Sequence, residues 1–201
     1  FTTYGFERNP FTAQHKVKGA YYFATDGFEL NYRGEFAKVI NKLNFVLDLN
    51  YQSPNFTQNF FGYGNETSNH QKDLGKNFNR VKIRGLSVAP GFMWNSLRGS
   101  KISFGGSYEV LEVDRTNNRF VDGNPALPEY VFDEVQFAGA HALYEFANYD
   151  SSAYPTMGMA FDLNIGFKTN LDKDKTFGYL ISQWHIAHRL IPSGNLVLAT
   201  T

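Results

Sequence analysis

The chain of 201 residues contains no cysteine, which excludes a disulfide framework and a thiolate metal site. Its formal net charge is zero, so the charge balance does not direct it towards nucleic acid. No apolar run approaches the roughly 18 residues that a membrane-spanning helix needs. These absences exclude a helical membrane protein. They do not exclude a membrane β-barrel, whose strands are each only about ten alternating residues long.

Aromatic residues are abundant, at 17% of the chain with 20 Phe and 12 Tyr, and there are 18 glycines. The clearest alternating run covers residues 159–167. One face carries Met159, Phe161, Leu163, Ile165 and Phe167, and the other carries Ala160, Asp162, Asn164, Gly166 and Lys168. Because successive side chains of a strand point to opposite faces, this pattern predicts a strand with one apolar and one polar surface. The apolar surface would meet a second sheet in a soluble sandwich, or lipid in a transmembrane barrel.

About nine such strands follow one another as hairpins, with no helical period between them. Alternate connections are short (38–42, 95–100, 148–158 and 191–194), whereas two of the others are long (53–76 and 114–134). The short hairpin at 25–27 is the exception. Short turns at one end, longer loops at the other and Phe and Tyr on the apolar faces are typical of outer-membrane barrels. The pattern predicts an all-β, antiparallel transmembrane β-barrel, with residues 1–201 as an internal piece of a single larger barrel domain.

The polar faces of these strands predict the lining of a lumen. The candidates are Glu29, Arg33, Glu35, Asp48, Arg80, Lys82, Arg84, Asp162 and Asn164. If the row Arg80, Lys82 and Arg84 faces inward, it forms a basic strip that pairs with Asp48, Glu29 or Glu35 across the lumen. Such a strip would serve structural pairing or the passage of anions. Pro90 and Gly91 lie in the same predicted strand and suggest a bulge that could change its phase.

The loop at 56–64 is too aromatic for a free extracellular loop. We expect it to fold over the barrel mouth, or to pack against a neighbouring loop or a partner. The residues of this mouth loop are Phe60, Phe61, Gly62, Tyr63, Gly64, Asn65 and Glu66.

Catalytic and metal-binding patterns are weak. His185 and His188 are three residues apart on a strand, which places them on opposite faces and argues against a shared metal. His141 and Glu145 share a face and could act as a base with its orienting carboxylate, but no serine stands in a recognisable nucleophile setting. We therefore expect no enzyme activity, cofactor or metal. A barrel hydrolase remains an alternative, and a soluble β-sandwich binder is the weakest one.

Three segments resemble the barrel domain of the outer-membrane assembly-factor and bacterial surface-antigen superfamily, which includes barrel-assembly and two-partner-secretion pores. Tyr154, Pro155, Thr156, Met157 and Gly158 match the family's Pro-Thr-x-Gly turn before an ascending strand. Residues 59–67 resemble the Phe-Phe-Gly-x-Gly-Asn-Glu segment of a branch sometimes fused to a periplasmic metallophosphoesterase. Residues 188–190 and 194–198 resemble the strands that precede the family's lumen-inserted loop.

The resemblance implies a position from the third to the eleventh strand of a barrel of about sixteen. The Arg-Gly-Phe or Arg-Gly-Tyr motif of the inserted loop would then follow Thr201, so the best functional residues of the family map to no position here. The implied function is the insertion or translocation of proteins, or of lipid, at the cell outer membrane. Its implied partners are outer-membrane lipid and client or partner outer-membrane proteins, without nucleic acid. The anchor of a fused phosphoesterase is an alternative role.

Overall fold

The protein forms one antiparallel β-sheet, seen in a computed structural model. The structure describes residues 1–5, 11–62, 69, 71–96, 99–122, 124, 127–151, 153–191 and 197–200. The strands are β1 (Thr2–Thr3), β2 (Ala13–Tyr22), β3 (Gly27–Ile40), β4 (Leu43–Gln52), β5 (Thr57–Asn59), β6 (Arg80–Asn95), β7 (Ser100–Asp114), β8 (Val135–Tyr149), β9 (Gly158–Asn170), β10 (Lys175–Arg189) and β11 (Val197–Thr200).

The strand order follows the chain, so each long strand pairs with its neighbours in sequence. This confirms the predicted all-β fold of sequential hairpins. Nine of the strands correspond to the predicted ones. The prediction missed β1 and β5, which have only 2 and 3 residues, and β5 pairs with β6 beside the main path. It also missed two short helical turns in the long loops, α1 (Gln71–Leu74) and the 3-10 helix η1 (Glu129–Phe132).

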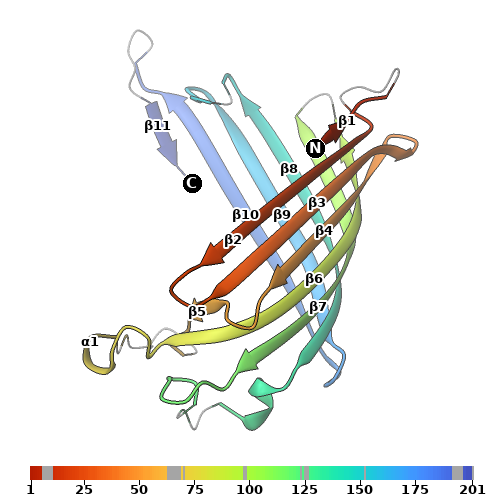
Figure 1. Cartoon of the computed structure of the whole chain (residues 1–201). Coiled ribbons are helices and arrows are strands. Elements are labelled where there is room, and N and C mark those ends of the chain that lie inside the picture. Colours follow the sequence, from red (N-terminus) through yellow and green to blue (C-terminus); the bar gives the residue numbers. More distant parts are fainter. Residues whose placement is uncertain are drawn as a thin grey trace.

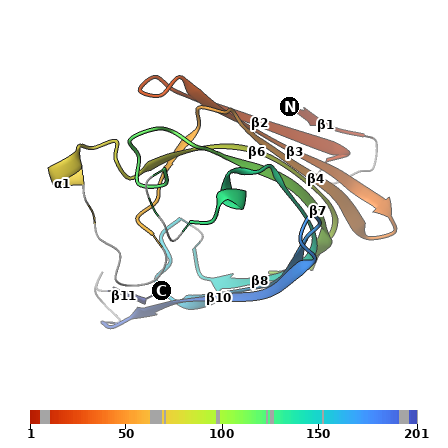
Figure 2. The same cartoon turned by 90° about the horizontal axis from the view of Figure 1, so that it is seen from below.

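The sheet curls round a central space and is not closed within the described residues (Figures 1 and 2). Its two ends are β1 with β2 on one side, and β10 with β11 on the other. The connections between β3 and β4, between β6 and β7 and between β8 and β9 lie at one end of the strands. The long loops that follow β4 and β7 lie at the other end, together with the short connections between β2 and β3 and between β9 and β10 (Figure 1). No helix in the described part of the chain is both long and apolar enough to cross a bilayer.

The convex face is apolar over the middle of the sheet. Its side chains alternate with concave ones, so in β9 it carries Met159, Phe161, Leu163, Ile165 and Phe167. We call the whole set of these outward apolar side chains the apolar band. The pairing registers join it across the strands, because Leu86 lies opposite Val110 and Phe161 lies opposite Trp184. Many of its members are strongly exposed in the chain alone, with Val17 at 70% and Leu180 at 65%.

An aromatic row follows the border of the band nearest the short turns. Phe36, Phe45, Phe92 and Phe104 come from four successive strands of the sheet, with ring centroids 6.0, 5.7 and 6.1 Å apart. The outward aromatic rings therefore form a continuous row over β3, β4, β6 and β7. Further along the same convex face, between β9 and β10, the Phe161 ring lies 4.4 Å from that of Trp184.

The strand β6 corrects the prediction for the basic row. Its register with β7 is the same on both sides of Pro90, with Val88 opposite Tyr108 and Gly91 opposite Gly105. Arg80, Lys82 and Arg84 therefore share the convex side with Leu86 and Val88. Their predicted position in the lumen is wrong, because the 16-residue strand continues beyond the apolar band and its outward positions become charged there.

Candidate functional site

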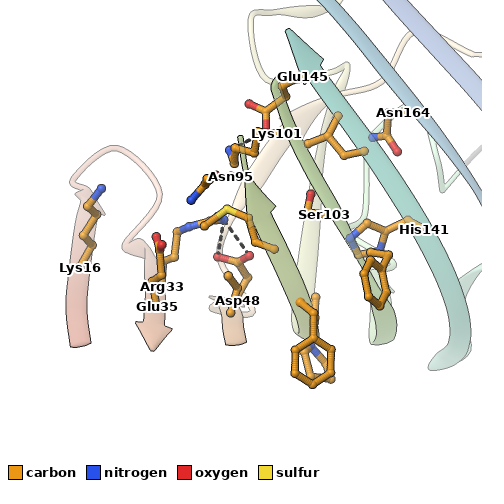
Figure 3. Close-up of a pocket in the computed structure, with 18 residues that line it drawn as sticks. Lys16, Arg33, Glu35, Asp48, Asn95, Lys101, Ser103, His141, Glu145 and Asn164 are labelled. Carbon is orange, nitrogen blue, oxygen red and sulfur yellow. Dashed lines mark hydrogen bonds and ion pairs between the residues drawn. The ribbon is translucent and has the colours of Figure 1, made fainter. Parts of the chain in front are cut away.

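A polar groove of about 650 Å³ occupies the concave face (Figure 3). Side chains from β2, β3, β4, β6, β7, β8 and β9 line it. Four of the residues predicted to face the lumen are among them, namely Arg33, Glu35, Asp48 and Asn164. By their place in the strand alternation, Glu29 and Asp162 lie on the same face as Arg33 and Asn164.

Ion pairs join strands on the concave face, both in the groove and beside it. Arg33 donates to both carboxylate oxygens of Asp48, at 2.9 and 3.1 Å, as Figure 3 shows. Lys101 lies 2.5 Å from Glu145, and Lys168 donates to both oxygens of Glu109 at 2.7 and 2.8 Å. Lys168 reaches across β8 to contact Glu109 on β7. The groove therefore presents paired charges of both signs instead of a field of one sign.

A hydrogen-bonded cluster continues the polar lining towards the long loops. Asn31 donates to Glu29 at 2.8 Å, and Asn50 donates to Asn31 and, at 3.3 Å, to Glu29. Nearer the short turns, Asn44 donates to Glu35 at 2.8 Å. Cross-strand contacts of this kind hold the polar side chains in place and add to the stability of the sheet.

Sequence reasoning placed Lys168 on the polar face of its strand but did not single out Lys101 and Glu109. These two residues occupy concave positions in β7, and the period-two pattern alone could have placed them there. The contact between Lys168 and Glu109 could not have been read from that pattern, because it joins strands that are not adjacent.

The arrangement does not assemble a catalytic triad. His141 and Glu145 both line the groove with Ser103. Glu145 is engaged by Lys101, and no hydrogen bond joins Ser103 to His141 among the described residues. On β10, His185 lies on the concave side and His188 on the convex side, since their positions differ in parity. No group of three or more metal-ligating side chains occurs in the described part of the chain.

The mouth loop packs against the second long loop. Phe60 contacts a buried cluster of Val81, Val121 and Leu127, and its ring lies 5.9 Å from that of Phe120. Asn79, which is fully buried, donates to the Phe60 carbonyl at 3.2 Å. These contacts form a cap at the long-loop end, with η1 beside it in the view of Figure 2.

Only part of the mouth loop lies within the described residues. Phe61 is half-buried, and Gly62 has a φ of 111°. Tyr63, Gly64, Asn65 and Glu66 lie outside the described residues, as do residues 194–196 of the segment that resembles the family near the end of the chain.

The turn that resembles the family motif is held by two residues that sequence reasoning did not identify. Asp150 accepts hydrogen bonds from the Thr156 hydroxyl, from the Thr156 amide at 2.9 Å and from the Met157 amide at 3.1 Å. Arg189, at the end of β10, donates to the Thr156 hydroxyl oxygen at 2.6 Å. The hydroxyl and amide donors hold the pKa of the Asp150 carboxyl well below its usual range. Tyr154 itself is exposed.

Comparisons of the chain with protein-family models, with curated proteins and with solved structures found no match.

Proposed function

We propose that this chain forms part of the wall of an outer-membrane β-barrel, with its convex face in lipid and its concave face towards a polar lumen. The observation that carries the proposal is the apolar band. In β9 it runs from Met159 to Phe167, which at about 3.4 Å per residue is about 27 Å along the strand. At a tilt of about 40° this spans about 21 Å, close to the ~25 Å apolar band of known barrels.

The exposure of the band argues against water as its surroundings. Leu180 and Trp184 of β10 are 65% and 56% exposed, and Ile165 and Phe167 beside them on β9 are each about half exposed. A continuous apolar surface of this kind on a soluble protein would promote aggregation. Lipid removes that cost, and it also explains why polar side chains occupy the concave face instead of a packed core.

We further propose that the barrel is of the protein-assembly or translocation type and acts without enzymatic chemistry. The resemblance of the turn at 154–158 and of the mouth loop supports this choice. The groove supports it as well, because the Glu145 carboxylate that would have to orient His141 in a hydrolase forms an ion pair with Lys101 through its Oε2 atom. The partners would be outer-membrane lipid and client or partner outer-membrane proteins.

Membrane fractionation of the native full-length protein tests the location. We expect it to resist carbonate extraction and to migrate faster on a gel when the detergent extract is not boiled. Release as a soluble protein without a heat shift would contradict the proposal, since the apolar band would then have to meet another protein surface.

Depletion of the native protein in its own cells tests the type of function. An assembly or translocation role predicts that other outer-membrane or secreted proteins are lost from their destinations, as measured by quantitative proteomics of the isolated membranes and medium. Unchanged protein levels would remove this role while leaving the barrel itself intact.

A further inference from the structure

We infer that Arg80 and Lys82 bind the phosphate of a membrane lipid headgroup, at the border of the apolar band nearest the long loops. The inference rests on the proposed membrane location. The first observation concerns the outward side chains of β6, which alternate along the strand. Towards the long loops they change from the apolar Val88 and Leu86 to the basic Arg84, Lys82 and Arg80. A basic row directly beyond the last lipid-facing side chains lies at the depth of the headgroups.

Both borders of the band carry aromatic side chains, and near the long loops the rings of Phe28 and Tyr51 lie 5.7 Å apart. The border near the short turns has the aromatic row of Phe36, Phe45, Phe92 and Phe104. At the opposite border, β6 carries charged side chains. Aromatic rings suit the general membrane interface, whereas cationic side chains add an electrostatic attraction for phosphate. The basic row on β6 adds this attraction at the border near the long loops, next to Leu86, which lies opposite Tyr51.

Arg84 does not belong to the site, because acidic neighbours already engage it. Its guanidinium lies 2.6 Å from Glu112 and 2.8 Å from Glu134. Arg84 therefore links β6 to β7 and to the start of β8, and its charge is neutralised.

Arg80 and Lys82 keep donors for a ligand. Within the described residues neither forms an ion pair: Arg80 donates to the Asn77 side chain at 3.1 Å, and Lys82 donates to the Asn55 side chain at 3.1 Å. An ammonium has three N–H donors and a guanidinium has five. Both hydrogen-bond partners are neutral amides, and two side chains at i and i+2 on one strand face can meet the same phosphate.

Asp114 is the acidic residue nearest to Lys82 in the strand register, and it affects the affinity for phosphate. It lies directly opposite Lys82 in the register between β6 and β7, yet the two form no ion pair, and its carboxylate accepts a hydrogen bond from the Thr116 hydroxyl at 3.1 Å. This negative charge beside the two cations lowers the affinity for anionic headgroups. Its removal should therefore strengthen phosphate binding.

The test measures the association of spin-labelled phosphatidylglycerol, relative to phosphatidylcholine, with the protein in phosphatidylcholine vesicles. Each Lys or Arg near a membrane surface contributes about fivefold, so Arg80→Gln with Lys82→Gln should lower the phosphatidylglycerol preference by up to about 25-fold. Asp114→Asn should raise it. The matched control, Lys72→Gln with Lys76→Gln, removes two charges from the loop at the same end and should change the preference little.

Flotation with the vesicles first shows whether each variant is inserted. An unchanged preference in the inserted Arg80 and Lys82 variant would overturn the headgroup site alone, as would an equal loss in the control variant, which would indicate general surface attraction. Failure of the unaltered protein to insert would overturn the proposed membrane location together with the site.

Discussion

Gly158 shows how one residue fixes the turn between β8 and β9. Its φ of +127° lies in the region that favours glycine, and a Cβ placed there would lie 1.9 Å from the Asn148 carbonyl oxygen. The turn therefore tolerates no side chain at this position without moving the backbone of the neighbouring strand.

We predict that Gly158→Ala destabilises the fold by more than about 1 kcal/mol, because it adds a backbone clash to an unfavourable φ. The measurement is urea unfolding in detergent micelles, followed by heat-modifiable migration. Gly75→Ala is the matched control: its φ is +92°, but nothing lies within 4 Å of the added Cβ. Equal losses in both variants would show that the φ alone matters and that the contact with Asn148 does not.

Asp150 makes the stability of the same turn sensitive to acid. Its folded-state pKa is lowered by the donors of Thr156 and Met157. Its contribution is therefore fully present above the unfolded pKa of about 3.9 and is lost as the pH falls through the lower folded value. We predict that Asp150→Asn lowers stability at neutral pH and flattens the pH dependence below about pH 4.

Unfolding midpoints measured from pH 2 to pH 7 check this prediction. Asp174→Asn removes a carboxylate from the turn between β9 and β10 and serves as the control. A profile for Asp150→Asn that runs parallel to that of the unaltered protein would show that the carboxylate does not support the turn.

The residues of this hydrogen-bonded turn differed in how readily they could be identified from the sequence. Thr156 and Gly158 stood in a short local motif. Arg189 lies 33 residues from Thr156, and its contact depends on the pairing of β9 with β10, so no local pattern indicated it. Asp150 lay within the predicted turn, but its role depends on the backbone geometry of Thr156 and Met157.

At the scale of the element, we expect a lysine substitution to cost different amounts of folding free energy on the two faces of β9. Ile165→Lys places a charge in the apolar band and should cost about 2–4 kcal/mol in lipid. Asn164→Lys places it on the concave side, in the polar groove, and should cost much less. Folding free energies in lipid vesicles measure the difference, and equal costs would show that the two faces have the same surroundings.

The cap is a second element that can be tested separately. Asn79 is fully buried and donates to the Phe60 carbonyl. We predict that Asn79→Ala costs about 1–3 kcal/mol locally, because it removes the hydrogen bond that the buried Asn79 side chain donates to the Phe60 carbonyl. Hydrogen exchange of residues 57–60 should become faster while exchange in β9 is unchanged. Faster exchange throughout the sheet would mean that the cap is not an independent unit.

The strands themselves were largely predictable, since long alternating segments carry a strong period-two signal. That signal is absent from β1 and β5, which are too short to show it. The direction of Arg80, Lys82 and Arg84 was missed for a different reason. In the proposed membrane setting a strand is apolar only within the bilayer, so charged residues further along it resemble a lumen lining although they share the parity of Leu86 and Val88.

At the scale of the whole molecule, the strand order could be predicted from the sequence, whereas the curvature of the sheet could not. Short connections between alternating segments predict that neighbours in sequence pair, and the sheet follows that order. The concave groove depends on the curvature of the sheet and on contacts such as Lys168 with Glu109, which skip a strand. The packing of the two long loops into a cap likewise required the fold.

A cysteine scan of β9 tests most directly that the convex face meets lipid. The chain has no cysteine, so single substitutions at residues 159–168 can each carry one spin label in the vesicle-inserted protein. We predict that odd positions are accessible to oxygen and protected from a water-soluble nickel reagent, with the opposite at even positions. Protection of the odd positions from both reagents would contradict the claim, because the apolar band would then be packed against protein.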